Sequence, residues 1–235
     1  RSGTLDGNDA GGSGNYGGIV GYLNNNTAAI LTVSNCLFDG KVVNNNATPG
    51  NCTFGGVIGY NNGGKATIKN CLSIGTVTST VTGQFFGKLN GNNSTFANNY
   101  YMGEFVNGTG SAGAASGDEP VLVDEGQLES DEIVLKLGIA FRRNLGKDDY
   151  PVLDATHNVV TEITDAGYAT LFVDNADLTV PAGVTAYVAE IEKTWLKLSD
   201  IGGTIPASTP VILKGTPAVY EFVPGTEPKV PHGAP

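Results

Sequence analysis

The sequence predicts an all-β protein in two parts: a parallel β-solenoid built from repeats, followed by a small β-sandwich domain. Three observations lead to this prediction. A Gly/Asn-rich passage recurs within the first 110 residues. Short runs of Val, Ile, Thr and aromatic residues alternate with turn-forming clusters along the whole chain, and no run has the length or period of a long helix. Finally, the composition changes abruptly near residue 110.

The change in composition separates two differently built segments. Residues 1–110 hold 19 of the 22 Asn and 22 of the 34 Gly, and five basic minus four acidic residues give them a net charge of +1. The remaining 125 residues carry eight basic minus nineteen acidic residues, or −11, which gives the chain total of −10. Neither segment has the clustered Lys and Arg that bind phosphates, so we expect no nucleic-acid partner.

Membrane spans and targeting signals are not expected within this sequence. No apolar run approaches the roughly 20 residues that cross a bilayer, and no charged-then-apolar leader is present. Because the sequence opens on RSG without Met and ends on PHGAP, we expect a fragment whose targeting signals and anchors lie outside it.

The repeat comprises a Gly-rich motif and a downstream strand. The three copies read YGGIVGY (16–22) with LTVSNCLFDGKV (31–42), FGGVIGY (54–60) with ATIKNCLSIGTV (66–77), and TGQFFGK (82–88) with STFANNYYMGEF (94–105). Equivalent positions are 38 and then 28 residues apart, which fits one coil of a parallel β-solenoid for each copy. We expect the glycines to supply the positive-φ corners between the strands.

Stacked coils place equivalent residues about 4.8 Å apart, the ordinary spacing of neighbouring strands. The predicted columns are Cys36, Cys71 and Asn99, and Ile19, Val57 and Phe85. The cysteines fit small buried apolar residues, although a Cys36–Cys71 disulfide is geometrically possible.

The two clearest copies resemble a known family. GIVG at 18–21 and GVIG at 56–59, each with its downstream Asn-Cys strand, resemble the GLUG repeats of bacterial surface proteins, including adhesin-like proteins and non-catalytic parts of immunoglobulin A peptidases. The resemblance covers about residues 14–106. Ile19 and Val57 replace the leucine of the repeat's name, and Gln84 replaces the first glycine of the third copy. The resemblance implies a non-catalytic protein that is secreted or displayed on a bacterial surface.

Residues 107–153 connect the two parts. The small residues of 107–120 predict a linker, and a cap, acidic first turn and closing glycine at 130–138 predict one short helix. Residues 141–153 (FRRNLGKDDYPVL) resemble a segment that closes such repeat regions. We therefore expect a solenoid domain over 1–153 and a second domain over 154–235.

The second domain shows seven strand-like runs separated by turn signals. The runs are 159–164, 168–173, 178–180, 184–191, 195–198, 211–213 and 219–223. Their spacing of roughly 8–12 residues suggests a β-sandwich. The stretch also resembles small C-terminal domains of surface proteins, which carry no defined activity.

We expect no catalytic residue, cofactor or metal ion. A glycosidase needs two carboxyl groups roughly 5–9.5 Å apart, yet Asp39 and Glu104 fall in the first and third coils, about 10 Å apart by stacking alone. Lys65, Lys69 and Lys88 have no carboxylates at matching positions for lyase chemistry. These patterns argue against an enzyme.

Three aromatic residues are the candidate ligand-binding groups. Tyr22 and Tyr60 follow equivalent glycines, so they should form a column that either faces outward as an aromatic platform or packs inside. Trp195 either packs at a core corner or contacts a ligand from the outer face. The first hypothesis is an adhesin-like protein that presents a surface to a host protein or glycan. The alternatives are a carbohydrate-binding accessory module of a larger secreted enzyme and a β-helix polysaccharide hydrolase or lyase; the oligomeric state stays open.

Overall fold

The computed structural model describes residues 3–6, 14–24, 30–44, 52–78, 82–83, 85–90, 94–103, 116–117 and 120–225. Contacts between Cα atoms divide the chain into unit 1, Arg1–Glu125, and unit 2, Gly126–Pro235. Each unit has its own core and is described by itself. Most of the predicted linker, together with Gln84 of the third repeat copy and the carboxylate Glu104, lies outside the described residues.

The division falls earlier in the chain than the boundary predicted near Asp154. The segment predicted to cap the repeats instead belongs to unit 2, where the backbone N–H of Leu145 donates to Glu221 Oε1 at 2.8 Å. Arg142 forms a bridge with Val152, and the backbone N–H of Arg143 donates to the carbonyl of Asn158 at 3.0 Å. The similarity of residues 141–153 to a closing segment therefore does not predict which unit they join.

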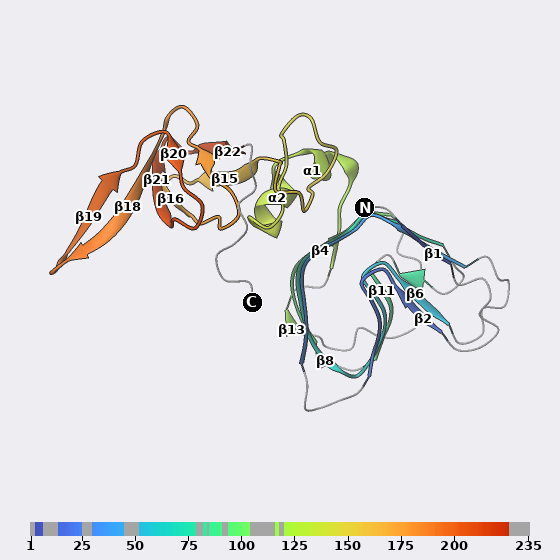
Figure 1. The fold of residues 1–235 in the computed structure, drawn as a ribbon. Helices are drawn as coiled ribbons and strands as arrows, with labels where there is room; N and C mark the ends of the chain where they lie inside the picture. The colour runs from blue at the N-terminus through green and yellow to red at the C-terminus, as the bar shows by residue number, and fades with distance from the viewer. Residues whose placement is uncertain are drawn as a thin grey trace. The chain divides into compact units, whose positions relative to one another are not determined.

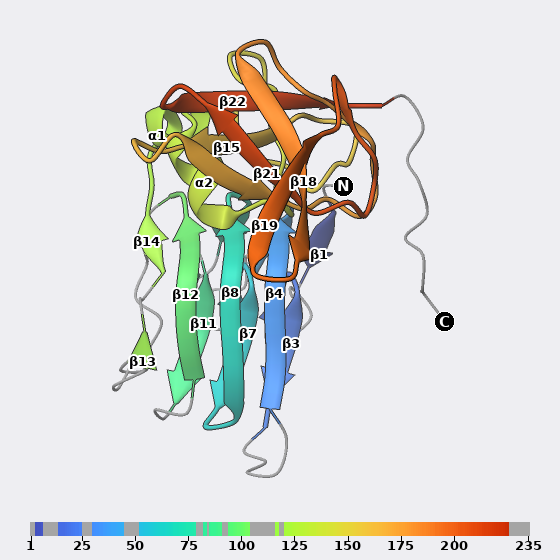
Figure 2. The same ribbon diagram turned by 90° about the vertical axis from the view of Figure 1, so that its left-hand side faces the viewer.

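Unit 1 consists of short strands joined entirely by parallel pairing. The strands are β1 (Thr4–Asp6), β2 (Asn15–Gly17), β3 (Val20–Leu23), β4 (Ile30–Phe38), β5 (Lys41–Val43), β6 (Thr53–Gly55), β7 (Ile58–Asn62), β8 (Lys65–Ser73), β9 (Thr76–Thr78), β10 (Thr82–Gly83), β11 (Phe86–Asn90), β12 (Ser94–Tyr101), β13 (Ser116–Gly117) and β14 (Val121–Leu122). They form four sheets, ordered β1-β5-β9, β10-β6-β2, β11-β7-β3 and β13-β12-β8-β4, with β14 also on β12. Figure 2 shows β4, β8 and β12 side by side.

The pairing register follows the sequence repeat. Cys36 pairs with Cys71, which pairs with Asn99, as the sequence predicts. At the corner after the first glycines, the N–H of Ile19 donates to the carbonyl of Val57, and the N–H of Val57 donates to that of Phe85. Each repeat thus contributes one strand to each shared sheet, one level beyond its predecessor.

The bend in the long strands comes from asparagine. Asn35, Asn70 and Asn98 have φ values of 54°, 52° and 52°, in the left-handed region that Asn tolerates better than most residues. Asn70 Nδ2 donates to Asn35 Oδ1 at 3.2 Å, and Asn98 Nδ2 donates to Asn70 Oδ1 at 3.3 Å. We call these three residues the asparagine ladder. The strands β4 and β8 curve along their length in Figure 1.

The prediction that glycines provide positive-φ corners is confirmed for Gly63 (φ 77°) and Gly103 (φ 103°) but is wrong for the glycines of the GIVG and GVIG motifs. Gly18, Gly21, Gly56 and Gly59 are all described, and none has a positive φ. They are needed because backbone approaches backbone: a Cβ on Gly59 would lie 2.6 Å from the Gly21 carbonyl oxygen and 2.7 Å from the backbone of Tyr16. Only glycine fits such a contact.

The core of unit 1 alternates with solvent-facing residues along the strands. In β8, Ala66 and Ile68 are buried whereas Thr67 and Lys69 point outward. The main cluster consists of Val33, Val57, Ile58, Ala66, Ile68, Cys71, Phe85, Phe86 and Phe96. A second cluster contains Phe54, which stacks on Tyr16 with ring centroids 4.8 Å apart. Burial of these like residues at successive levels holds the stack together.

Unit 2 consists of two antiparallel four-stranded sheets after two short helices. The helices are α1 (Glu125–Glu129) and α2 (Glu132–Leu137), and the strands are β15 (Val159–Ile163), β16 (Tyr168–Leu171), β17 (Leu178–Thr179), β18 (Val184–Glu192), β19 (Trp195–Asp200), β20 (Thr204–Ile205), β21 (Val211–Gly215) and β22 (Ala218–Pro224). The sheet orders are β15-β22-β17-β20 and β16-β21-β18-β19. Within the described residues, no helix is long and apolar enough to cross a membrane.

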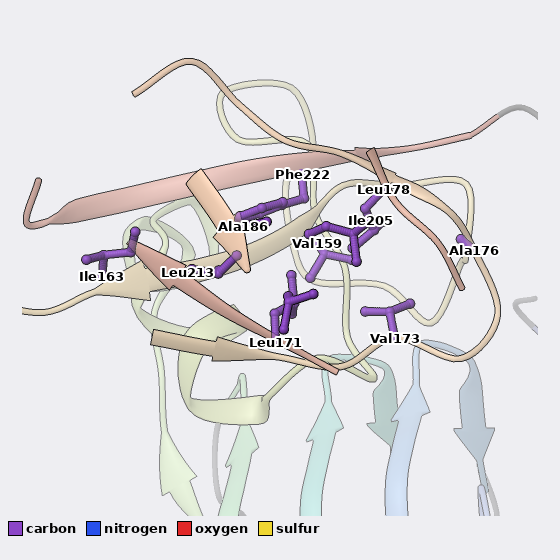
Figure 3. Packing of buried hydrophobic residues seen from close by; sticks show 11 residues of the cluster. Val159, Ile163, Leu171, Val173, Ala176, Leu178, Ala186, Ile205, Leu213 and Phe222 are labelled. Carbon is purple, nitrogen blue, oxygen red and sulfur yellow. The ribbon is translucent and has the colours of Figure 1, made fainter. Parts of the chain in front are cut away.

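The core of unit 2 draws side chains from both sheets. Figure 3 shows Val159, Leu178 and Phe222 from one sheet together with Leu171 and Leu213 from the other, in one buried cluster. All seven predicted strands are present, and the predicted helix is α2, with Gly138 closing it at φ 81°. The sequence did not predict α1 or the two-residue strand β20.

Candidate functional site

The predicted tyrosine column lies on β3 and β7 of unit 1. Tyr22 pairs in register with Tyr60, and their ring centroids are 5.5 Å apart with the ring planes inclined by 51°. Tyr22 is 45% exposed, and Tyr60 is half-buried beneath it. The sequence left open whether the two tyrosines face outward or pack inside. In the structure Tyr22 faces outward, and Tyr60 is partly exposed next to it.

Hydrogen bonds tie the two phenols to asparagine side chains. The Tyr60 hydroxyl donates to Asn62 Oδ1 at 2.9 Å, and Asn62 Nδ2 donates to the Tyr22 oxygen at 3.2 Å. The Tyr22 hydroxyl in turn donates to Asn24 Oδ1 at 3.2 Å. We call these four residues the tyrosine–asparagine ladder. Because the chain of bonds crosses from one level to the next, it fixes the rings before any ligand arrives.

The ladder offers two kinds of chemistry on one surface. The exposed faces of aromatic rings accept apolar groups of a ligand by stacking. Amide groups next to them both donate and accept hydrogen bonds. The four residues therefore present an uncharged surface that combines stacking faces with hydrogen-bonding groups. Sequence reasoning found the tyrosines but missed the two asparagines, whose signal is their equal distance, two residues, from each tyrosine.

Trp195 belongs to unit 2 and is not part of the ladder. It lies at the tip of the β18–β19 hairpin, which extends away from the rest of its sheet in Figure 1, and it is 75% exposed. It stands opposite Glu192, whose carboxylate forms an ion pair with Lys197 at 3.2 Å. The structure therefore excludes the core-corner interpretation and leaves Trp195 as a separate exposed aromatic.

The opposite face of the same hairpin is apolar. Because residues two apart share a face of a strand, Ile191 and Leu196 form an exposed cross-strand pair next to Leu198. All six residues of β19 are exposed, and β19 ends its sheet.

The carboxylates of unit 1 do not form a described pair. Asp39 lines a hollow of about 360 Å³ together with Lys41, Phe38 and backbone of residues 3–5 and 17–19. Asp9 and Glu104 lie outside the described residues, as does the side chain of Asp6. In the described part of the chain, no three His, Cys, Asp or Glu side chains converge as metal ligands would.

Cys36 and Cys71 lie at adjacent levels, and neither they nor the buried Cys52 elsewhere in the unit forms a disulfide. A hydrogen bond from the Cys71 thiol lowers the pKa of Cys36 to about 7 from the usual 9.0. The same bond, together with burial, raises the pKa of Cys71. One thiolate is therefore easily formed at this pair, and a second is not.

A buried arginine organises the start of unit 2. Arg143 is 1% exposed, and its guanidinium donates to the backbone carbonyls of Leu128, Ser130 and Asp148. Burial lowers the pKa of Arg143. The three carbonyls accept hydrogen bonds from its guanidinium N–H groups, whose directions are fixed. Its partners are all backbone groups, which makes it a structural group and not a candidate site.

Comparison of the chain with protein-family models, with curated proteins and with solved structures finds no match. The geometry of the tyrosine–asparagine ladder and of Trp195 is therefore the basis for a functional proposal.

Proposed function

We propose that this chain is a non-catalytic, adhesin-like protein, secreted or displayed on a bacterial surface, that binds a glycan along the outer wall of unit 1. In this proposal unit 1 is a parallel β-solenoid and unit 2 is a β-sandwich. Support for the first comes from four parallel sheets that share one register. Support for the second comes from a core that both antiparallel sheets contribute to.

The observation that carries the binding proposal is the exposure and order of the tyrosine–asparagine ladder. Two aromatic rings at successive levels lie 5.5 Å apart, and each phenol is held by an asparagine two residues further along its strand. Rings that are fixed in advance lose little conformational entropy on binding. Tyr22 is 45% exposed and lies on β3, the terminal strand of its sheet.

A glycan fits this surface better than a charged ligand does. The four ladder residues carry no formal charge, and Tyr and Asn supply stacking faces and amide hydrogen bonds. A host protein is the other ligand of the adhesin hypothesis and would need a larger contact area of about 800 Å² on each partner. We therefore propose that an oligosaccharide lies along the stack and contacts both rings.

The test is glycan-array binding by the full chain and by a Tyr22→Ala/Tyr60→Ala variant. We expect the double variant to bind its glycans at least about tenfold more weakly, because truncating a central aromatic contact usually costs more than 1 kcal/mol. Tyr168→Ala, which removes an exposed tyrosine of unit 2, is the matched control and should bind normally.

The outcomes separate the hypotheses. Equal loss in the Tyr168→Ala control, or unchanged binding by the double variant, would contradict a site at the ladder. Turnover of any polysaccharide by the purified chain would contradict the non-catalytic part of the proposal and favour a β-helix hydrolase or lyase.

A further inference from the structure

The sheets of unit 1 do not all end at the same level. Strands β2, β3 and β4 come from the same repeat copy, and each is the terminal strand of its sheet. The fourth strand of that copy, β5, is not terminal, because β1 pairs with it on the far side from β9. β1 therefore lies one level beyond β2, β3 and β4.

The sequence of β1 matches the end of a repeat copy. Gly3-Thr4-Leu5 aligns with Gly40-Lys41-Val42 and with Gly75-Thr76-Val77, and the pairing register is the same. The hydrogen bonds repeat as well: the N–H of Lys41 donates to the Gly3 carbonyl at 2.8 Å, and that of Thr76 donates to the Gly40 carbonyl at 2.9 Å. β1 thus has the position and the sequence of a last strand in a fourth copy.

Residues at this level are less buried than their equivalents. Ile19 is 41% exposed, whereas Val57 and Phe85 in the same column are fully buried. Cys36 is half-buried and Cys71 is buried. The hollow of about 360 Å³ lies between residues 3–5 of β1 and the glycine corner at 17–19. The apolar interior of the stack is therefore incompletely covered at this end.

The nine-residue strand β4 leaves a long edge. Within the described residues no strand pairs with it on the side away from β8. Unpaired strand edges with regular geometry accept further strands, and β4 lacks the proline and the inward-pointing charge that would block one.

We infer that the edges of β2, β3 and β4 are a docking surface for one further coil of the same repeat, of which β1 is the last strand. The inference rests on the stacking in unit 1 and does not depend on the proposed glycan. The occupant is a parallel coil because β1 already continues the stack in parallel register. A second copy related by a two-fold axis perpendicular to the sheet would instead present antiparallel strands.

The second sequence repeat of this chain can supply the strands that such a coil needs in addition to β1. Residues 52–74 carry β6, β7 and β8, and residue 74 joins Gly75 as it would join Gly3. In the test chain, residues 52–74 replace residues 1–2 directly before Gly3. We expect the backbone amides of β4 that point away from β8 to exchange hydrogen at least about tenfold more slowly than in the parent chain, and the melting temperature to rise by about 4 °C or more.

The matched control carries Gly55→Leu in the added segment only, which blocks the close backbone contact that Gly55 makes with the following copy. It should exchange like the parent. Circular dichroism reports that each chain is folded. Equal exchange at β4 in the extended chain and in the control would overturn the inference. Slow exchange at β4 in the parent, together with a dimeric mass in light scattering, would also overturn it, because a second copy would then occupy the edge.

Discussion

The two units reach an all-β structure by different physical means. Unit 1 stacks short parallel strands whose backbones touch at glycines, so successive levels are held by like residues in columns. Unit 2 pairs antiparallel strands and buries a varied set of apolar side chains between two sheets. The two units should therefore tolerate different substitutions. Unit 1 has least space around the backbone of its glycines, and unit 2 has least space around its buried side chains.

The largest contrast should come from adding one methyl group to a glycine. Gly59→Ala in unit 1 forces a Cβ to within 2.6 Å of a carbonyl oxygen, whereas Gly203→Ala in unit 2 meets no heavy atom within 4 Å. Overpacking against backbone cannot be relieved by a rotamer change, so we expect Gly59→Ala to destabilise unit 1 by about 3 kcal/mol or more.

Gly203→Ala should change the free energy of unfolding by less than about 0.5 kcal/mol. Hydrogen exchange over residues 52–78 and over unit 2, followed by mass spectrometry, measures the two effects separately. Similar effects of the two substitutions would remove the distinction between the units.

The same contrast explains what could be predicted from the sequence. In unit 2, turn residues separate short runs of strand-favouring residues, and all seven predicted runs are found. The two-residue strand β20 is too short to leave a pattern, and it forms because Leu178 pairs with Ile205. Tertiary contact, rather than local sequence, creates that strand.

In unit 1 the columns were predictable, but the reason for the glycines was not. Repetition revealed that Cys36 and Cys71 stack, because equal spacing implies equal position in the coil. The sequence does not show whether an invariant small residue serves a positive φ or a close contact. In the structure the positive φ is found at Asn35, Asn70 and Asn98 and at Gly63 and Gly103. The glycines of the GIVG and GVIG motifs make close contacts instead.

The functional residues show a similar limit. The pairing of Tyr22 with Tyr60 followed from the repeat, whereas their exposure depends on which face of the sheet other residues cover. Trp195 could not be placed because its hairpin extends beyond the core of unit 2, a feature of strand length rather than of residue type. The match of Gly3–Leu5 to the end of a repeat copy spans only three residues, which is too short to stand out in the sequence.

A smaller effect should come from the asparagine ladder. Asn70 has φ 52° and bonds to Asn35 and Asn98 at neighbouring levels. Asn70→Ala should lower the free energy of unfolding by about 1–2 kcal/mol, because the left-handed conformation is sterically unfavourable for alanine. Asn70→Gly avoids that penalty and should cost less, although it also loses the side-chain bonds.

Thermal unfolding monitored by circular dichroism compares the two variants. If Asn70→Gly proved more destabilising than Asn70→Ala, the ladder's hydrogen bonds, and not its backbone conformation, would dominate at this corner.

The smallest expected effect is on the reactivity of the Cys36 and Cys71 thiols and not on stability. Unit 2 has no counterpart to this pair, because all three cysteines lie in unit 1. The pKa of Cys36 is lowered to about 7 by a hydrogen bond from Cys71. The thiolate is the reactive form, so the rate of Cys36 alkylation should rise with pH, with a midpoint near 7 instead of the ordinary 9.0. Cys71→Ala removes the donor and should move the midpoint upward, whereas Cys52→Ala should leave it in place. Peptide mapping after iodoacetamide treatment across pH 5–10 measures each site. If the midpoint is the same with and without Cys71, the Cys71 thiol does not lower the pKa of Cys36. The two cysteines at adjacent levels would then interact only through packing.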